Sequence, residues 1–405
     1  MNSVPVTLSA QSNASLDDVS HLGYKEKTNL GSFYTPVAIV DQVYDMVHRN
    51  CGEEAADVIL ETSCGYGAFL AVPPTQAHAR LIGADFDPVA LDIARAKYPQ
   101  VTLIETNSLT RISRAKFSIG EGERLLIVGN PPYNDVTSHV KNHIKAAAFE
   151  VDEDVRSRDL GLSFLLSFAK LEPALIAVLH PLSYLIKEAN FKILCPLMRN
   201  YRLRDALVFN SQTFSETSKL SGFPIVIALY ERNSRGTTYS DVFSRKFETI
   251  EGASFSLSEF DYVARYISKY PSRTYFPKSS AAYRFYTMRD INALKRSRTF
   301  IREDTANAIR IAPEKLSYYC YVDAFKEIAG SLPYYLGNFD VMFDHAAFTK
   351  MAEDFVVLSA SKHPHVLQGA QFNFTRKRCE QARESVRLYF DRLLARHRGV
   401  YRLQN

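Results

Sequence analysis

The chain has 405 residues, of which 46% are hydrophobic and 23% charged, and it carries a net charge of +5. This length and composition predict two domains with sizeable cores. No apolar run approaches the roughly 20 residues that a membrane-spanning helix needs, and the N-terminus lacks the features of a signal peptide. The five cysteines are scattered without a CxxC pair, which predicts a reduced, cytoplasmic protein with no disulfide or zinc framework.

Helical and strand-like segments alternate along the first half of the chain. Helical spacing of apolar residues predicts helices, and short apolar runs between them predict strands. The expected helices are 36–48, 88–98 and 158–171, and the expected strands lie within 57–70, 79–87, 101–109, 125–133 and 174–185. The glycine-rich turn after the first of these strands is expected to lead towards a further helix. The segments 201–209 and 224–232 could form a closing antiparallel pair. This alternation predicts an α/β fold with a mostly parallel sheet covered by helices on both faces.

The alternation ends near residue 235. Tyrosine, phenylalanine and basic residues become frequent beyond this point, and an apolar stripe with helical spacing at 379–394 predicts a basic C-terminal helix. We therefore predict a flexible tail at 1–27, an α/β domain at 28–235 and an α+β domain at 236–405. The basic clusters of the last domain are either solvated helix faces or a surface for a polyanion.

Unusual polar residues follow three of the expected strands, where the active sites of such sheets lie. The stretch 61–67, ETSCGYG, places an acid and a glycine turn after the first strand, which can serve a ligand or be a plain tight turn. Asp85 ends the second strand and could accept bonds from ribose hydroxyls, whereas Asp87 is expected to cap the next helix. Asn107 ends the third strand and could bind an adenine edge or be a turn residue. Together, the three positions indicate a nucleoside-cofactor site.

A fourth strand ends in the segment 127–135, IVGNPPYND. Consecutive prolines fix φ twice and remove two backbone donors, so this turn forms a rigid ledge of carbonyl acceptors. A chain that only had to turn would use Asn-Gly or a similar pair instead. The ledge therefore predicts a site that accepts hydrogen bonds.

The order of these motifs resembles that of class I S-adenosylmethionine-dependent methyltransferases, and specifically the gamma class of DNA adenine-N6 methyltransferases. Asn130, Pro131, Pro132 and Tyr133 match the catalytic (D/N/S)PP(Y/F) motif, and GSFYTP at 31–36 matches the segment that packs over the methionine moiety. The resemblance covers about residues 30–232. It implies a Rossmann-like mixed seven-stranded sheet, S-adenosylmethionine as cofactor and a C-terminal target-recognition domain. The cofactor-binding residues that it implies are Tyr34, Thr35, Glu61, Ser63, Gly65, Asp85, Phe86, Asn107, Ser108 and Asn130.

The resemblance also implies a mechanism for the ledge. The Asn130 side-chain oxygen and the Pro131 carbonyl would each accept one N–H of an adenine amine, which exposes the nitrogen lone pair for attack on the sulfonium methyl. Tyr133 would stack on a base rotated out of the duplex. Phe223 could pack against the same base or belong to the core. The polar stretch 134–160 is expected to be a lid, and His139 and His143 within it are expected to be ordinary surface residues, so no metal is predicted.

Double-stranded DNA is the expected partner, and a separately encoded restriction endonuclease is a second partner that the resemblance suggests. The expected DNA-binding residues are Arg284, Arg289, Lys295, Arg296, Arg298 and Arg302. Thr62 and Asn107 depart from the family pattern, which has a proline and an aspartate there. This leaves open a non-catalytic DNA-binding subunit with the same fold. An RNA adenine or protein glutamine methyltransferase and a cytosine-N4 target are further alternatives.

Overall fold

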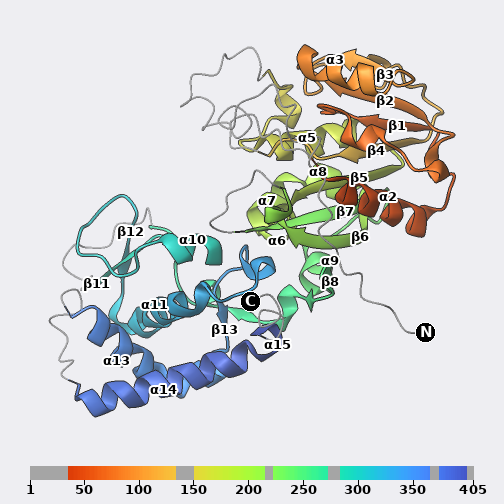
Figure 1. Ribbon diagram of the computed structural model, residues 1–405. Coiled ribbons are helices and arrows are strands. Elements are labelled where there is room, and N and C mark those ends of the chain that lie inside the picture. The colour runs from red at the N-terminus through yellow and green to blue at the C-terminus, as the bar shows by residue number, and fades with distance from the viewer. Residues whose placement is uncertain (1–34, 134–149, 215–221, 272–282, 365–373, 399–405) are drawn as a thin grey trace, which may run out of the picture.

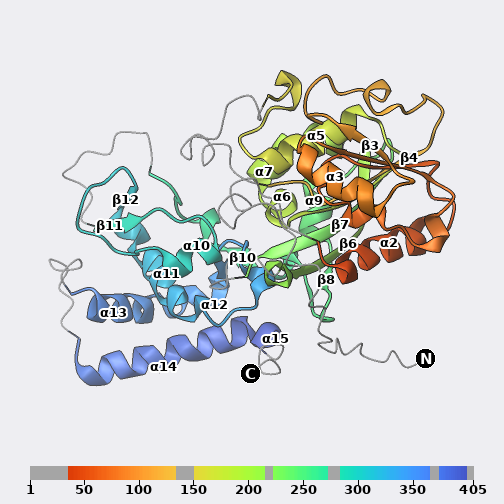
Figure 2. The same cartoon turned by 45° about the horizontal axis from the view of Figure 1, so that its top comes forward.

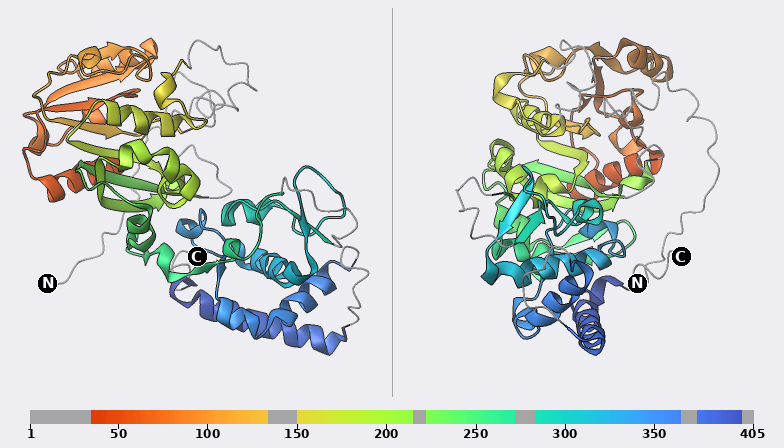
Figure 3. Two further views of the ribbon diagram at one scale, coloured as in Figure 1. Left: turned by 180° about the vertical axis from the view of Figure 1, so that it is seen from behind. Right: turned by 90° about the vertical axis from the view of Figure 1, so that its left-hand side faces the viewer.

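The computed structural model describes residues 35–133, 150–214, 222–271, 283–364 and 374–398. An α/β part carries the N-terminal half, and a second part built mainly of helices carries the C-terminal half (Figure 1). The chain passes from one to the other through helix α9 (Tyr239–Ser244) and strand β8 (Phe247–Thr249), which the view from behind shows clearly (Figure 3). Several expected features lie outside the described residues: the tail 1–27, Tyr34, and residues 134–149 of the lid expected at 134–160, with His139 and His143.

One nine-stranded sheet organises the α/β part, in the order β3-β2-β1-β4-β5-β7-β6-β8-β9. Its strands are β1 (Val58–Glu61), β2 (Arg80–Asp85), β3 (Thr102–Glu105), β4 (Leu125–Gly129), β5 (Leu175–Pro181), β6 (Tyr201–Asn210), β7 (Pro224–Arg232), β8 and β9 (Ser254–Phe255).

Strands β1 to β7 form the mixed seven-stranded sheet that we expected. Strands β1 to β5 are parallel, and β7 runs antiparallel to both β5 and β6, which confirms the closing antiparallel pair. The two short strands β8 and β9 extend this sheet beyond β6. They lie after residue 235, so the sheet continues across the proposed domain boundary, and that boundary stays a prediction.

Helices cover both faces of the sheet, as the alternation predicted (Figure 2). Leu126 and Val128 of β4 pack with α2 (Val37–Cys51), while Leu125 and Ile127 of the same strand point to the opposite face and pack with α5 (Leu160–Lys170). This alternation is the two-residue period of a strand buried on both sides. The remaining helices of this part are α3 (Pro88–Lys97), α6 (Ser183–Ile186), α7 (Glu188–Ile193) and α8 (Cys195–Met198).

The glycine turn after β1 does not lead into an α-helix, contrary to our expectation. It is followed by a three-residue 3-10 turn, Ala68–Leu70, and then by a loop. The reason lies in Pro73 and Pro74, because a proline disfavours the helical conformation of the residue before it and cannot donate to a preceding turn.

The C-terminal part is α+β, as expected. Helix α11 (Leu316–Ala329) lies at its centre, and the ring of Tyr321 contacts Phe343, Phe355 and Phe390 at centroid distances of 4.9 to 5.6 Å. The apolar stripe predicted at the end of the chain forms α14. The other elements are β10 (Asp261–Tyr262), β11 (Tyr283–Tyr286), α10 (Ile291–Arg296), β12 (Ala308–Ile311), β13 (Met342–Phe343), α12 (His345–Thr349), α13 (Ala352–Lys362), α14 (Arg376–Leu393) and α15 (Ala395–Arg398).

Within the described ranges, no helix is long and apolar enough to cross a membrane. All five cysteines are free thiols. The described residues also contain no group of three or more His, Cys, Asp or Glu side chains that could hold a metal ion. The cytoplasmic location stays a prediction.

Candidate active site

The carboxyl ends of β1, β2 and β4 bring most of the predicted site residues to one edge of the sheet. Glu61 is the last residue of β1, Asp85 the last of β2, and Asn130 follows β4 directly. The parallel pairing of β1 with both neighbours places these three strand ends next to one another. Ser63 and Phe86 lie just beyond their strands at the same edge.

Asp85 organises the glycine turn. Its carboxylate accepts hydrogen bonds from the backbone N–H of Gly65 at 2.8 Å and of Asp87 at 3.0 Å. Gly65 has φ of +50°, and a Cβ built there would meet no atom within 4 Å, so the turn borders open space. Burial raises the pKa of the Asp85 carboxyl, although the backbone donors of Asp87, Gly65 and Phe86 oppose this shift.

Asp87 is the N-cap of α3, as predicted, and accepts from Val89 N at 3.0 Å and Ala90 N at 3.4 Å. Asp87 is therefore the cap residue. The Asp85 carboxylate can accept about four hydrogen bonds, so its three backbone donors leave room for a ligand hydroxyl. The adjacent Phe86 ring is 48% exposed and offers an apolar surface beside this carboxylate. Together, they fit a ribose with an attached base.

Both polar atoms of the Asn107 side chain form hydrogen bonds with the backbone of this chain. Its Oδ1 accepts from Leu109 N at 3.0 Å, and its Nδ2 donates to the Glu150 carbonyl at 2.8 Å. Both bonds favour the alternative that Asn107 is a turn residue. The neighbouring Ser108 hydroxyl is buried and donates to the Thr62 carbonyl at 2.6 Å, so it ties the end of β3 to the end of β1.

The two polar atoms of the Asn130 side chain differ in their hydrogen bonding. Its Nδ2 donates to the Thr35 hydroxyl at 3.3 Å, while its Oδ1 is buried and has no hydrogen-bond partner among the described residues. Within the same ranges, no N–H group donates to the Pro131 carbonyl. A buried acceptor without a partner costs about 1–3 kcal/mol, so this oxygen is suited to accept a hydrogen bond from a ligand N–H.

Glu61 is a second buried acceptor on the strand beside Asn130. Its side chain is only 3% exposed, its Oε2 has no hydrogen-bond partner among the described residues, and Gly129 lies directly against its Cγ. Burial first, and then repulsion by Asp85, raise the pKa of the Glu61 carboxyl well above its usual range. The carboxyl accepts one backbone hydrogen bond, from Phe69, and its partnerless Oε2 is suited to an amino group or a sulfonium.

We expect Glu61→Gln to stabilise the protein increasingly as the pH rises. Because the folded-state pKa of Glu61 is raised, the folded protein holds an extra proton above the usual glutamate pKa, and it loses stability as the pH rises through that raised pKa. Urea unfolding of both proteins between about pH 5 and about pH 8 measures the difference. Asp57→Asn, just before the same strand, is the control with the opposite sign. Hydrogen bonds from Arg124 lower the pKa of Asp57, so its ionised carboxylate stabilises the folded protein above the unfolded-state pKa. The Asp57→Asn variant should therefore be less stable than wild type in that pH range. A constant gap between wild type and Glu61→Gln would contradict the assignment.

Tyr133 and Phe223, the residues expected to contact a base, are both half-buried. Burial raises the pKa of the Tyr133 hydroxyl, and the nearby Asn130 side chain opposes this shift. Phe223 packs against the core on the α2 side of the sheet, and its backbone pairs with Ser211, so core packing accounts for its contacts.

The six basic residues predicted to bind DNA differ in their partners. Arg284 lies 3.8 Å from an Asp304 carboxylate oxygen, and Arg298 lies 3.8 Å from Glu303. Lys295 is half-buried, and burial lowers its pKa. Three residues are exposed and form no ion pair with a described residue: Arg289, Arg296 and Arg302.

Arginines of the basic C-terminal helix form ion pairs with carboxylates of the same helix and of α13. Arg387 contacts Glu384 at 2.6 Å and Asp391 at 3.0 Å, and Arg378 contacts Asp354 of α13 at 2.6 Å. These contacts favour the alternative of a solvated helix face for this cluster.

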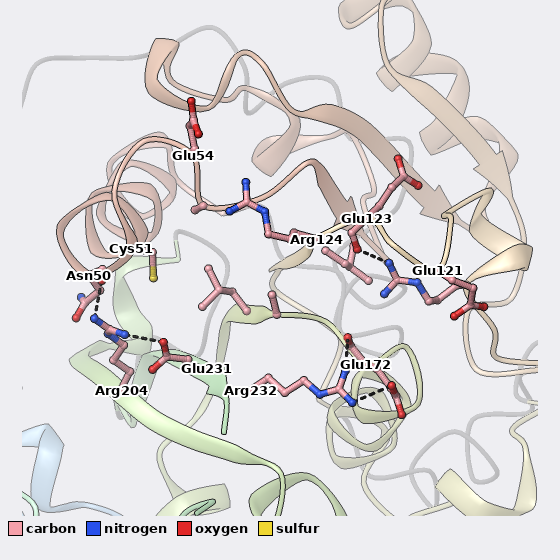
Figure 4. A pocket seen from close by; sticks show the side chains of 15 residues that line it. Asn50, Cys51, Glu54, Glu121, Glu123, Arg124, Glu172, Arg204, Glu231 and Arg232 are labelled. Carbon is pink, nitrogen blue, oxygen red and sulfur yellow. Dashed lines mark hydrogen bonds and ion pairs between the residues drawn. The ribbon is translucent and has the colours of Figure 1, made fainter. Parts of the chain in front are cut away.

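A pocket of about 630 Å³ lies at the opposite edge of the sheet, where β4 and β5 begin (Figure 4). Two of its arginines pair with carboxylates inside the pocket, Arg204 with Glu231 at 2.7 Å and Arg232 with Glu172 at 2.9 Å, whereas Arg114 donates to the Gly120 and Leu171 carbonyls. It contains none of the predicted site residues. We therefore place the candidate active site at the carboxyl edge, where Glu61 Oε2 and Asn130 Oδ1 lie buried without partners among the described residues.

Sequence reasoning missed Tyr184, which lies near Tyr133 just after β5. It also missed Gly129, whose φ of +145° lets the chain leave β4 close against Glu61. A glycine immediately before the NPPY motif was a visible signal for the second, but nothing local marked the first.

No family model matches the chain, and no curated protein matches it. Many solved structures match about half of the chain. One is a proposed class I S-adenosylmethionine-dependent methyltransferase from Listeria monocytogenes, with 12% identity, a TM-score of 0.39, and 54% of this chain and 66% of that chain covered. Another is the N-methyltransferase NodS from Bradyrhizobium japonicum with S-adenosyl-L-homocysteine, with 14% identity, a TM-score of 0.32, and 52% and 97% covered. A proposed RNA methyltransferase from Pyrococcus horikoshii has 12% identity, a TM-score of 0.35, and 52% and 92% covered.

Proposed function

We propose that this protein is an S-adenosylmethionine-dependent methyltransferase that modifies the N6 amine of adenine in double-stranded DNA. The observation that carries the proposal is the buried Asn130 Oδ1, which lacks a partner and lies next to the Pro131 carbonyl at the end of β4. An adenine amine has two N–H groups, and these two acceptors provide one site for each. The C-terminal domain would supply the contacts to the duplex.

The residues at the carboxyl edge fit the proposed cofactor. Asp85 and Phe86 would hold the ribose and the adenine, Gly65 leaves the space for their approach, and the Glu61 carboxylate would face the positive charge of the methionine part. Bound S-adenosylmethionine supplies an electrophilic methyl group. The Thr35 hydroxyl holds the Asn130 amide, which leaves the amide oxygen to accept from the substrate amine.

The catalytic role of the chain is to orient the amine and polarise it. The adenine amine is a weak nucleophile because its lone pair is delocalised into the ring. Two fixed acceptors would draw electron density from the ring back to the amine nitrogen and hold this nitrogen in line with the methyl group. This role needs neither a covalent intermediate nor a strong base. Tyr133 would stack on the flipped base, which is worth about 1–3 kcal/mol and offsets part of the unstacking cost.

Methyl transfer from labelled S-adenosylmethionine to unmethylated bacterial DNA, total RNA and a protein extract tests this proposal. We expect label in DNA, recovered as N6-methyladenine and absent with Asn130→Ala. Label in RNA or protein alone would overturn the DNA substrate in favour of an RNA adenine or a protein glutamine. Binding of the cofactor without transfer to any substrate would instead favour a non-catalytic subunit.

We further propose that the protein is the modification arm of a restriction–modification system in the cytoplasm. If so, DNA methylated by this protein is protected at the sites that a cognate, separately encoded endonuclease cleaves. Sequencing of methylated positions after expression in a methylation-free host would reveal one recurrent site, whereas scattered methylation would contradict the proposal.

The exposed arginines of the C-terminal domain should contribute to DNA affinity through phosphates. Replacing Arg289, Arg296 and Arg302 together by alanine should lower the slope of log affinity against log salt by about 0.9 for each lost phosphate contact. The paired residues Arg376 and Arg387 of α14 provide the matched control, because they already contact carboxylates. Equal salt slopes for the triple variant and wild type would remove these arginines from the interface.

A further inference from the structure

The first turn of α5 lies against Tyr133 more closely than a side chain would permit. A Cβ built on Gly161 would lie 2.8 Å from the Tyr133 Cβ and 2.5 Å from the Tyr184 hydroxyl oxygen. Gly161 has an ordinary helical backbone and is not among the glycines with positive φ, so its conformation does not require glycine. What requires glycine here is the close approach of the two tyrosines.

Tyr184 is held firmly on the other side of this contact. Its hydroxyl donates to a carboxylate oxygen of Asp159, and the same oxygen accepts from Gly161 N at 3.0 Å as the N-cap of α5. The Tyr184 ring stacks on the His180 ring with a centroid distance of 5.5 Å and an interplanar angle of 15°. Both rings are fully buried.

Two hydrogen bonds hold the His180 ring of this stack in place. Its Nδ1 donates to the Pro181 carbonyl at 3.0 Å, which leaves Nε2 to accept from the Tyr230 hydroxyl at 2.8 Å. Burial lowers the pKa of His180 to about 4, so the ring stays neutral across the physiological range. A continuous series of contacts therefore runs from β7 through His180 and Tyr184 to the residue that follows the two prolines.

We propose that Gly161, Tyr184 and Asp159 form a clamp that positions Tyr133, and through it the target base, relative to Asn130. This inference rests on the proposed function, because it assigns to Tyr133 the stacking role at that site. The prolines fix the backbone before Tyr133, and the clamp limits where its Cβ and ring can lie after them. The three clamp residues are positioning residues that do not touch the reacting atoms.

A tryptophan reporter tests the clamp without any methyl transfer. The chain contains no tryptophan, so Tyr133→Trp introduces a single one at the clamped position. In this background we expect Gly161→Ala to increase acrylamide quenching and lower the anisotropy of that tryptophan. Gly122→Ala and Gly330→Ala should leave both unchanged, because a Cβ at either position meets no atom within 4 Å. Unchanged quenching in a folded Gly161→Ala protein would overturn the clamp.

Kinetics with native Tyr133 provide the second readout. We expect Gly161→Ala to lower kcat by roughly 10- to 100-fold, since a displacement of about 1 Å can cost that much, while cofactor affinity stays within about twofold. Tyr184→Phe should partly rescue Gly161→Ala, because it removes the oxygen that the new methyl group would meet. An unchanged kcat, or an equal loss in kcat and cofactor affinity, would contradict a positioning role.

The two experiments separate failure of the clamp from failure of the proposed function. If the wild-type protein methylates no nucleic acid, the proposed function fails while the tryptophan measurement still decides the clamp. If Gly161→Ala does not fold, as judged by circular dichroism, Tyr184→Phe and Asp159→Asn in the reporter background take its place. More mobile tryptophan in either variant supports the clamp, and wild-type quenching in both overturns it.

Discussion

Asn130→Ala should reduce methyl transfer by at least about 10²–10³-fold, the loss seen when one preorganised polar group is removed from a reacting centre. The substitution removes the buried Oδ1 that has no other partner in the described chain, so little else depends on that atom. Single-turnover methylation of DNA measures the chemical step, and calorimetry measures cofactor binding. We expect the cofactor affinity to change by less than about tenfold, or 1.4 kcal/mol.

Two comparisons sharpen this prediction. Asn130→Asp keeps an acceptor and matches another form of the motif, so it should retain more activity than the alanine variant. Asn50→Ala removes an asparagine at the opposite edge of the sheet, where its Nδ2 donates to Asp205, and should leave kcat unchanged. Near-wild-type activity of Asn130→Ala would exclude Asn130 from catalysis.

Asp85→Ala should weaken S-adenosylmethionine binding by about 100-fold or more, because hydrogen bonds to a charged group contribute about 1.5–3 kcal/mol each. The loss should also release the glycine turn, since Gly65 N would no longer be held. Isothermal titration with the cofactor measures the effect directly. Affinity equal to wild type would contradict the ribose role.

Asp87→Ala is the matched control for Asp85, two residues along the same loop. It removes the N-cap of α3, which typically costs about 0.5–2 kcal/mol of stability, without touching the carboxylate that faces the turn. We therefore expect a lower melting temperature with nearly unchanged cofactor affinity. A parallel loss of affinity in both variants would mean that the whole loop, and not Asp85, is responsible.

The raised pKa of Asp85 makes a further distinction possible. Burial disfavours its charge in the folded protein, and Asp85→Asn removes that charge together with one of the two oxygens that accept from Gly65 N and Asp87 N. Asp85→Asn should hence bind cofactor more weakly than wild type, with a smaller loss of stability in urea than Asp85→Ala. Such a separation of stability and binding is typical of a functional carboxylate.

Local patterns were sufficient to predict most elements of the fold and the position of the site. Asp87 followed by proline marks the start of α3, and the apolar stripe ending near Leu394 marks α14; the structure confirms both. These features depend on residues within a few positions of one another, so they can be recognised in the sequence. The same holds for the NPPY turn, whose prolines restrict the backbone wherever it lies in the fold.

Other features depend on contacts between distant segments. One partner of the Asn107 side chain is the distant Glu150 carbonyl, and Arg378 of α14 pairs with Asp354 of α13. The sequence alone could not show these two contacts. The helix expected after the glycine turn was a wrong prediction, although Pro73 and Pro74 in the sequence argue against a helix there. The strand order that joins β1 to β4 likewise arises only on folding.

The sequence by itself determined the chemical groups of the site: an acid after β1, an acid after β2 and a rigid acceptor ledge after β4. Only the tertiary structure decided which polar atoms of these groups lack a partner within the described chain and can accept a hydrogen bond from a ligand. Parallel pairing places Glu61 beside Gly129, and burial leaves Glu61 Oε2 and Asn130 Oδ1 without described partners. Whether a polar atom has a partner depends on every segment packed around it, and these segments come from the whole chain.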